Sequence, residues 1–125
     1  MTMASELSVG TLTISFTKSG SPSFEFSPAA QSITVAGDAW MDNTQTVGTS
    51  EEAILLGDVA TGGYWFVHNL DSANYITIRP GTGATDMIQV KAGEWAVFRS
   101  SSAASAPYAL ANTGACQVRF LRLEA

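Results

Sequence analysis

Apolar and polar side chains alternate along most of this 125-residue chain. Leu12, Ile14 and Phe16 lie between threonine and serine, and the same alternation returns at 24–26, 33–35, 76–78, 88–90 and 95–97. A period of two is that of a β-strand with one buried and one solvated face, and no window shows the 3.6-residue period of an amphipathic helix. The pattern therefore predicts an all-β protein.

Turn-forming residues separate these segments. Glycine, proline, asparagine or aspartate occurs at 18–22, 36–38, 57–58, 61–63, 69–71, 80–84 and 91–93. These residues supply the backbone angles that tight turns need, so strands recur about every ten residues. The spacing predicts a jelly-roll-like β-sandwich of about nine or ten short antiparallel strands.

The alternation changes parity near the N-terminus. Leu7 and Val9 are odd-numbered, whereas the next apolar residues are even-numbered, and a bulge at Gly10 would absorb the extra residue. We therefore expect an extended N-terminal arm at 1–9 and a single β-sandwich domain at 10–125. Met1, Met3, Leu7 and Val9 share one parity and are interface candidates. The arm either packs on another subunit or on a capsid surface, or folds back on its own domain.

Two segments are apolar at both parities. The run 64–67 predicts a central strand that is covered by a second sheet and by a neighbouring subunit. Near the C-terminus, Val118 and Phe120 give way to Leu121 and Leu123. That change indicates either a second bulge or a strand that is apolar on both faces.

The three tryptophans allow two interpretations. Trp40 lies between two aspartates, so we expect it to be exposed and name it as an interface anchor. Trp65 and Trp95 lie in apolar strands, which places them in the core. The alternative is a sugar-stacking platform formed by the three tryptophans with the tyrosines at 64, 75 and 108.

Charge is scarce, at 14% of residues against roughly 25% in an average soluble domain. Charged side chains keep the edges of a β-sandwich from pairing with other chains, and this chain has few of them. Neighbouring subunits that cover the edges would serve the same purpose, which favours a closed oligomer. The net charge is −5 with only six basic residues, so nucleic acid is not an expected partner. No apolar run approaches the length of a membrane span, and no membrane partner is expected.

Candidate chemistry is sparse. His68 and Cys116 are the only residues of their types, and we interpret both as structural. A Cys116–His68 nucleophile pair in a small hydrolase remains an alternative. We predict no enzymatic activity and name no catalytic, cofactor-binding or metal-ligating residue.

Several turns and strand ends resemble those of small structural proteins of tailed bacteriophages. The segments are QTVGTSEEA (45–53), LGD (56–58), GYWFVHNLD (63–71), NYI (74–76) and KAGEWAVF (91–98), and the strand at 115–124 fits the usual ending. The resemblance implies a jelly roll or β-sandwich without enzymatic activity. It also implies a place in the virion, on the capsid as a decoration or cement protein, or in the tail.

These observations lead to one main hypothesis and two alternatives. The main one is a capsid decoration protein, made in the host cytoplasm, that binds the outer surface of a phage head as a homotrimer. Its partners are its own copies and the major capsid protein or another virion protein. The alternatives are a tail or adsorption component and, from another class, a carbohydrate-binding module.

Overall fold

The computed structural model describes residues 5–10, 12–16, 19, 24–35, 39–55, 57, 59, 63–101 and 107–124. These residues form antiparallel strands and no helix, which confirms the all-β prediction. The chain divides into two compact units, Met1–Ala36 and Gly37–Ala125. Each unit is described by itself below.

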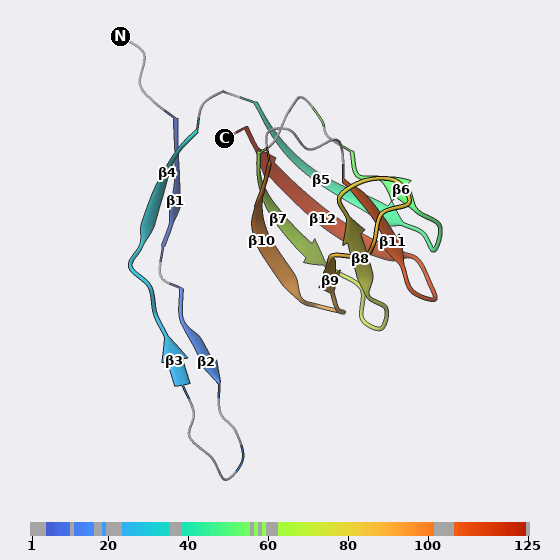
Figure 1. Cartoon of the computed structure of the whole chain (residues 1–125), viewed down its shortest axis with the longest axis horizontal. Helices are drawn as coiled ribbons and strands as arrows, with labels where there is room; N and C mark the ends of the chain where they lie inside the picture. Colours follow the sequence, from blue (N-terminus) through green and yellow to red (C-terminus); the bar gives the residue numbers. More distant parts are fainter. Residues whose placement is uncertain are drawn as a thin grey trace. The chain divides into compact units, whose positions relative to one another are not determined.

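The first unit is a two-stranded ribbon. Strand β1 (Ser5–Val9) pairs with β4 (Gln31–Val35), and β2 (Ile14–Phe16) pairs with β3 (Phe24–Phe26). The numbers of paired residues add up to 40 in both pairs, for example at Val9↔Gln31 and Ile14↔Phe26. The four strands are therefore two stretches of one long hairpin (Figure 1).

The bulge predicted at Gly10 is wrong. A bulge adds a residue to one strand and would shift the register, whereas the register is the same before and after this position. The pairing of the two strands is interrupted where Pro28 lies opposite Leu12 in this register. Proline has no N–H group to donate to a neighbouring strand. The hydroxyls of Thr13 and Ser27 lie 3.4 Å apart across the gap.

The division of the chain differs from the expected boundary after Val9. Because β1 pairs with β4, the segment 24–35 belongs to the same unit as the N-terminal residues, and the boundary lies between Ala36 and Gly37. Within its described part, the N-terminal segment pairs with a strand of its own chain. Of the interface candidates, Met1 and Met3 lie outside the described residues.

The second unit is a jelly roll. Its strands are β5 (Trp40–Val47), β6 (Glu52–Ala53), β7 (Gly63–Asn69), β8 (Ile76–Arg79), β9 (Ile88–Val90), β10 (Trp95–Ser100), β11 (Tyr108–Ala111) and β12 (Cys116–Leu123). They form two four-stranded sheets with the orders β10-β7-β12-β5 and β6-β11-β8-β9 (Figure 1). Counted from β5, these are the orders 6-3-8-1 and 2-7-4-5 of a jelly roll, which confirms the predicted fold.

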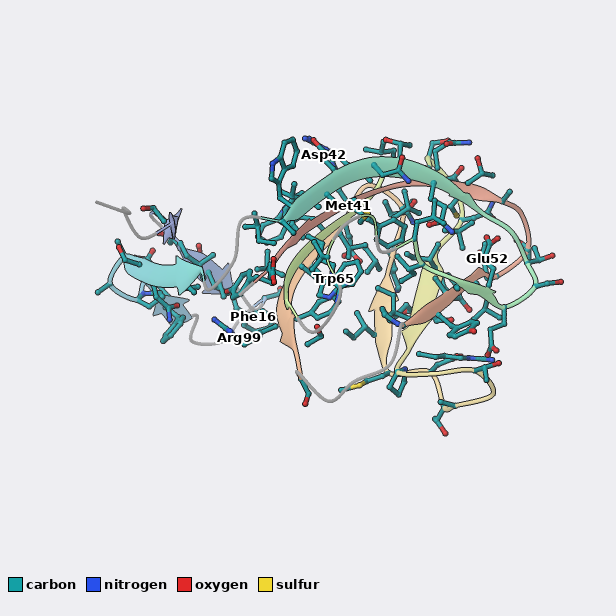
Figure 2. All side chains as sticks on the ribbon, turned by 90° about the horizontal axis from the view of Figure 1, so that it is seen from above. Phe16, Met41, Asp42, Glu52, Trp65 and Arg99 are labelled. Carbon is teal, nitrogen blue, oxygen red and sulfur yellow. The ribbon has the colours of Figure 1, made fainter. Side chains whose placement is uncertain are left out.

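The core lies between the two sheets and centres on Trp65. Met41 and Trp65 point into this space from the first sheet (Figure 2), where they join Phe120 and apolar residues of the second sheet. The Trp65 ring stacks on Phe98 at 6.2 Å and meets Phe120 edge-on at 6.4 Å. Such aromatic contacts stabilise the core beyond the burial of their area.

One charged side chain is part of this core. Arg122 is buried, and its guanidinium lies 4.7 Å from the Trp65 ring centroid. Its Nη1 donates a hydrogen bond of 3.0 Å to the carbonyl oxygen of Val59. Burial lowers the pKa of Arg122, and the cation–π contact and the hydrogen bond compensate its charge.

Strand β12 is continuous and apolar on both faces. Its register with β5 runs without a shift from Cys116↔Val47 to Leu123↔Trp40, so the strand contains no bulge. Val118 and Phe120 face the core, while Leu121 and Leu123 lie half-buried on the opposite face. Of the two interpretations of this segment, a second bulge or a strand that is apolar on both faces, the structure shows the strand that is apolar on both faces.

Candidate interaction surface

The outer face of the β10-β7-β12-β5 sheet carries mainly aromatic and aliphatic side chains, and we call it the aromatic face. Residues 65 and 67 of β7 point into the core, so the even-numbered residues of this strand point outward. The strand registers place three rows across the sheet: Trp95, His68, Arg119 and Thr44; Val97, Phe66, Leu121 and Asp42; and Arg99, Tyr64, Leu123 and Trp40.

Large apolar side chains on this face are open to solvent. Trp40 is 63% exposed, Trp95 is 55% exposed and Val97 is 43% exposed. Phe66 stacks on Trp95 with ring centroids 6.0 Å apart, and its ring lies 6.2 Å from that of His68. Exposed large apolar side chains gathered on one face are typical of a surface that binds another molecule.

Charged residues of the aromatic face are paired with neighbours on the same face. Arg119 donates to both carboxylate oxygens of Asp42, at 2.9 and 2.7 Å. This hydrogen bonding holds the pKa of Asp42 below its usual value. The guanidinium carbon of Arg99 lies 5.7 Å from the Tyr64 ring centroid. An apolar centre with compensated charges beside it is the composition of a protein–protein interface.

The predictions for the tryptophans are confirmed at two positions and wrong at one. Trp40 is exposed and Trp65 is fully buried, as expected, whereas Trp95 lies on the aromatic face rather than in the core. The alternation at 95–97 predicts that Trp95 and Val97 face the core, but Ala96 and Phe98 are also apolar and can face it instead. Pairing with β7 decides it, because Trp95 comes opposite His68, whose side chain points outward.

The six aromatic residues proposed as one sugar platform do not lie together. Trp40, Tyr64 and Trp95 belong to the aromatic face, and Trp65 is in the core. The tyrosines at 75 and 108 belong to the region of the other sheet, around β8 and β11. A platform that uses all six is therefore wrong.

The ribbon of the first unit carries a second apolar surface. Ile14 pairs with Phe26, and Phe16 comes two residues after Ile14 in the same strand, so these three side chains share one face of the ribbon. Ile14, Phe16 and Phe26 are each about half exposed. The candidates Leu7 and Val9 lie further along the ribbon in β1, where they pair with Ile33 and Gln31.

The candidate nucleophile and base are not brought together. His68 lies on the aromatic face, whereas Cys116 is buried on the core side of the same sheet. Burial raises the pKa of the Cys116 thiol, which favours its unreactive protonated form. The Cys116–His68 pair considered from the sequence is therefore contradicted by the geometry.

Within the described ranges, no group of three or more histidine, cysteine, aspartate or glutamate side chains is arranged to hold a metal ion. No described residue belongs to a helix long and apolar enough to cross a membrane. No known protein family, curated protein sequence or solved structure matches the chain.

Proposed function

We propose that this protein is a non-enzymatic structural component of a tailed-bacteriophage virion, and that it decorates the outer surface of the capsid. The turn and strand-end segments that resemble small phage structural proteins support this proposal. The jelly-roll order of β5 to β12 also supports it, because viral capsid proteins are among the proteins built on this architecture.

The aromatic face is the observation on which the proposal depends most. Burial of apolar surface contributes roughly 25 cal/mol per Å², so exposed Trp40, Trp95 and Val97 provide a driving force for association. Trp and Arg are enriched at binding surfaces, and both occur on this face. The chemistry that such a face performs is binding.

We propose a homotrimer that contacts the major capsid protein or another virion protein. A closed ring of subunits covers apolar surface on every copy and leaves no open interface. The net charge of −5 suits the outside of the head, since an acidic protein inside it would be repelled by packaged DNA.

We assign the ribbon, in addition to the aromatic face, to contacts with neighbours. A two-stranded ribbon is at best marginally stable alone in water, and this one exposes apolar side chains of β2 and β3. We propose that residues 5–35, together with Met1 and Met3, engage a neighbouring subunit or the capsid surface. This proposal extends the contact that the sequence predicts for 1–9.

The role of the aromatic face is tested with the double variant Trp95→Ser/Val97→Ser. Both side chains are exposed, so the variant keeps its fold, which circular dichroism verifies. We expect the wild-type protein to sediment as a trimer and to bind capsids of the encoding phage that lack it, and the variant to lose one or both properties. Gln89→Ala, exposed on the other sheet, is the matched control. A variant that assembles and binds like the wild type would show that this face is not the interface.

The position in the virion is tested with gold-labelled antibodies on intact particles of the encoding phage. Label on the heads supports the decoration protein. Label confined to tails favours the tail or adsorption alternative, and unlabelled particles that contain no copy of the protein would refute a virion role altogether.

A further inference from the structure

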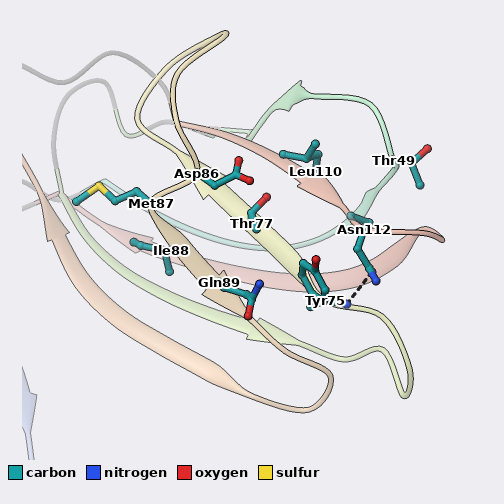
Figure 3. A pocket seen from close by; sticks show the side chains of 10 residues that line it. Thr49, Tyr75, Thr77, Asp86, Met87, Ile88, Gln89, Leu110 and Asn112 are labelled. Carbon is teal, nitrogen blue, oxygen red and sulfur yellow. Dashed lines mark hydrogen bonds between the residues drawn. The ribbon is translucent and has the colours of Figure 1, made fainter.

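A groove runs over the outer face of the second sheet, on the opposite side of the sandwich from the aromatic face. Its volume is about 460 Å³, within the roughly 300–1,000 Å³ typical of small-molecule sites. Thr77 lies at its centre, between Leu110 of β11 and Gln89 of β9 in the strand register. Tyr75, Asn112 and Thr49 surround one end, and Asp86 and Met87 the other (Figure 3).

The polar groups of the groove are mostly neutral and are available to a ligand. Thr77 is only 7% exposed, yet within the described part of the chain its hydroxyl has no hydrogen-bond partner and is not sealed from solvent. The Gln89 amide likewise has no partner among the described residues. The Oδ1 atom of Asn112 accepts the Tyr75 N–H at 3.0 Å, which orients the side chain and leaves its NH₂ group to donate.

The charges near the groove compensate each other. Arg79 donates to Asp86 Oδ1 at 2.5 Å and to Glu51 Oε2 at 2.7 Å, so it is occupied by two carboxylates. Arg79 is not among the residues that line the groove, and no lining residue is basic. An anionic ligand would therefore meet a carboxylate and no free cation, which disfavours phosphates and acidic sugars.

Apolar side chains complete the site. Leu110 and Met87 provide apolar surface beside the hydroxyl and amide groups, and Tyr75 adds an aromatic ring. A saccharide presents this same combination, because its hydroxyls donate and accept hydrogen bonds while its C–H face packs on apolar and aromatic groups. We propose that this groove binds a neutral saccharide unit of a glycan.

The proposal is independent of the virion role and of the aromatic face. It also differs from the sugar platform considered from the sequence, since Tyr75 is the only residue of that set that lines the groove. Thr77, Gln89 and Asn112 carry the hydrogen bonding here, and none of them is a tryptophan or tyrosine.

The test is a titration of the ¹⁵N-labelled full-length protein, followed by amide chemical shifts. The probes are the methyl glycosides of glucose and galactose and free N-acetylglucosamine, with glucuronate and glucose 6-phosphate as charged comparators. We expect at least one neutral probe to cause saturable shifts at Thr77, Gln89 and Asn112, with a dissociation constant in the millimolar range. The charged probes should bind more weakly.

Two variants identify the groove as the site. Thr77→Val keeps the shape of the side chain and removes its hydroxyl, and Gln89→Ala removes the exposed amide. Each should weaken binding about five- to tenfold, the equivalent of one hydrogen bond. Gln117→Ala, an exposed glutamine on the first sheet, is the matched control and should bind like the wild type.

Four outcomes would overturn the proposal. Three of them come from the titration: no saturable shifts with any neutral probe, shifts that map to Phe66 and Trp95 instead of the groove, or stronger binding of a charged probe than of its neutral counterpart. The fourth is an unchanged affinity in both groove variants. None of them bears on whether the protein is found on virions, so the two proposals fail separately.

Discussion

Replacement of Asn69 by alanine should be among the most damaging single changes in the jelly roll. Asn69 is the last residue of β7 and is fully buried. Its Nδ2 donates to the carbonyl oxygens of Asn74 at 2.9 Å and Val90 at 3.1 Å, and its Oδ1 accepts the Asp71 N–H at 3.0 Å. One amide thus joins the end of β7 to the turn at 70–74 and to the end of β9.

The expected loss follows from the burial of the three partners. The Val90 carbonyl is buried, so leaving it without a donor should cost about 2 kcal/mol. The bonds to Asn74 and Asp71 are partly buried, and water can replace part of each, so they contribute about 1 kcal/mol apiece. We therefore expect Asn69→Ala to lower the free energy of unfolding by about 4 kcal/mol, against a typical total of roughly 5–15 kcal/mol.

Urea unfolding followed by tryptophan fluorescence measures this loss, since Trp65 lies at the centre of the core. Gln117→Ala is the control, because Gln117 is exposed and its side chain donates to Thr46 Oγ1 in a hydrogen bond at the surface. That variant should stay within about 0.5 kcal/mol of the wild type. A loss below about 1 kcal/mol for Asn69→Ala would refute the role given to the amide.

A second variant, Asn69→Asp, tests the direction of the hydrogen bonds. Its ionised carboxylate would face two carbonyl oxygens without a proton to donate, so folding should raise the pKa of the introduced group above the roughly 3.9 of an unfolded aspartate. Below that pH both states are protonated and the variant is least destabilised. As pH rises toward the folded-state pKa, its stability relative to the wild type should fall. A difference from the wild type that does not change with pH would contradict this geometry.

Two further predictions concern the same domain. The N–H groups of Asn74 and Ala73 donate to the Asp71 carboxylate and hold its pKa below 3.8. The contribution of Asp71 to stability is therefore complete above pH 3.8 and is lost as the pH falls through the lowered pKa. Asp71→Asn should flatten the decrease of the unfolding free energy at acid pH, and an unchanged decrease would exclude this role. Gly63 has φ = 115°, and a Cβ there would lie 2.6 Å from the Leu123 carbonyl oxygen. Gly63→Ala should therefore lower the free energy of unfolding by more than about 1 kcal/mol, whereas Gly48→Ala, which meets nothing within 4 Å, should change it little, and equal effects in the two variants would contradict the clash.

The alternation of side chains was sufficient to predict the fold class and most of the strands. A period of two is local information, since each residue's steric preference and its apolar or polar character act on its immediate neighbours. The turn segments were also readable, and the structure gives their residues local roles. Asp71 accepts two backbone N–H groups in its turn, and Glu94 accepts the N–H of Lys91. Segments on which the phage resemblance rests thus include residues that close turns.

The pairing between distant segments could not be predicted from the sequence and is seen only in the tertiary structure. The common register that joins 5–9 to 31–35 and 14–16 to 24–26 places the unit boundary after Ala36, and no local pattern contains that register. The sequence predicts Trp95 in the core because it lies in an apolar strand, but Ala96 and Phe98 of β10 are apolar as well, and only the pairing with β7 turns the Trp95 ring outward. Where both parities are apolar, alternation cannot choose a face.

The groove shows most clearly that a local sequence pattern cannot reveal which distant residues come together. Thr49, Thr77, Gln89 and Asn112 come from separate segments, and each by itself reads as an ordinary polar residue of a strand or turn. They line one site because β8 pairs with β9 on one side and with β11 on the other, although β11 comes about 30 residues later in the chain. The sequence alone determined which residues form strands and turns, whereas the jelly-roll order determined which of their side chains meet, because strand pairing depends on contacts far apart in the chain.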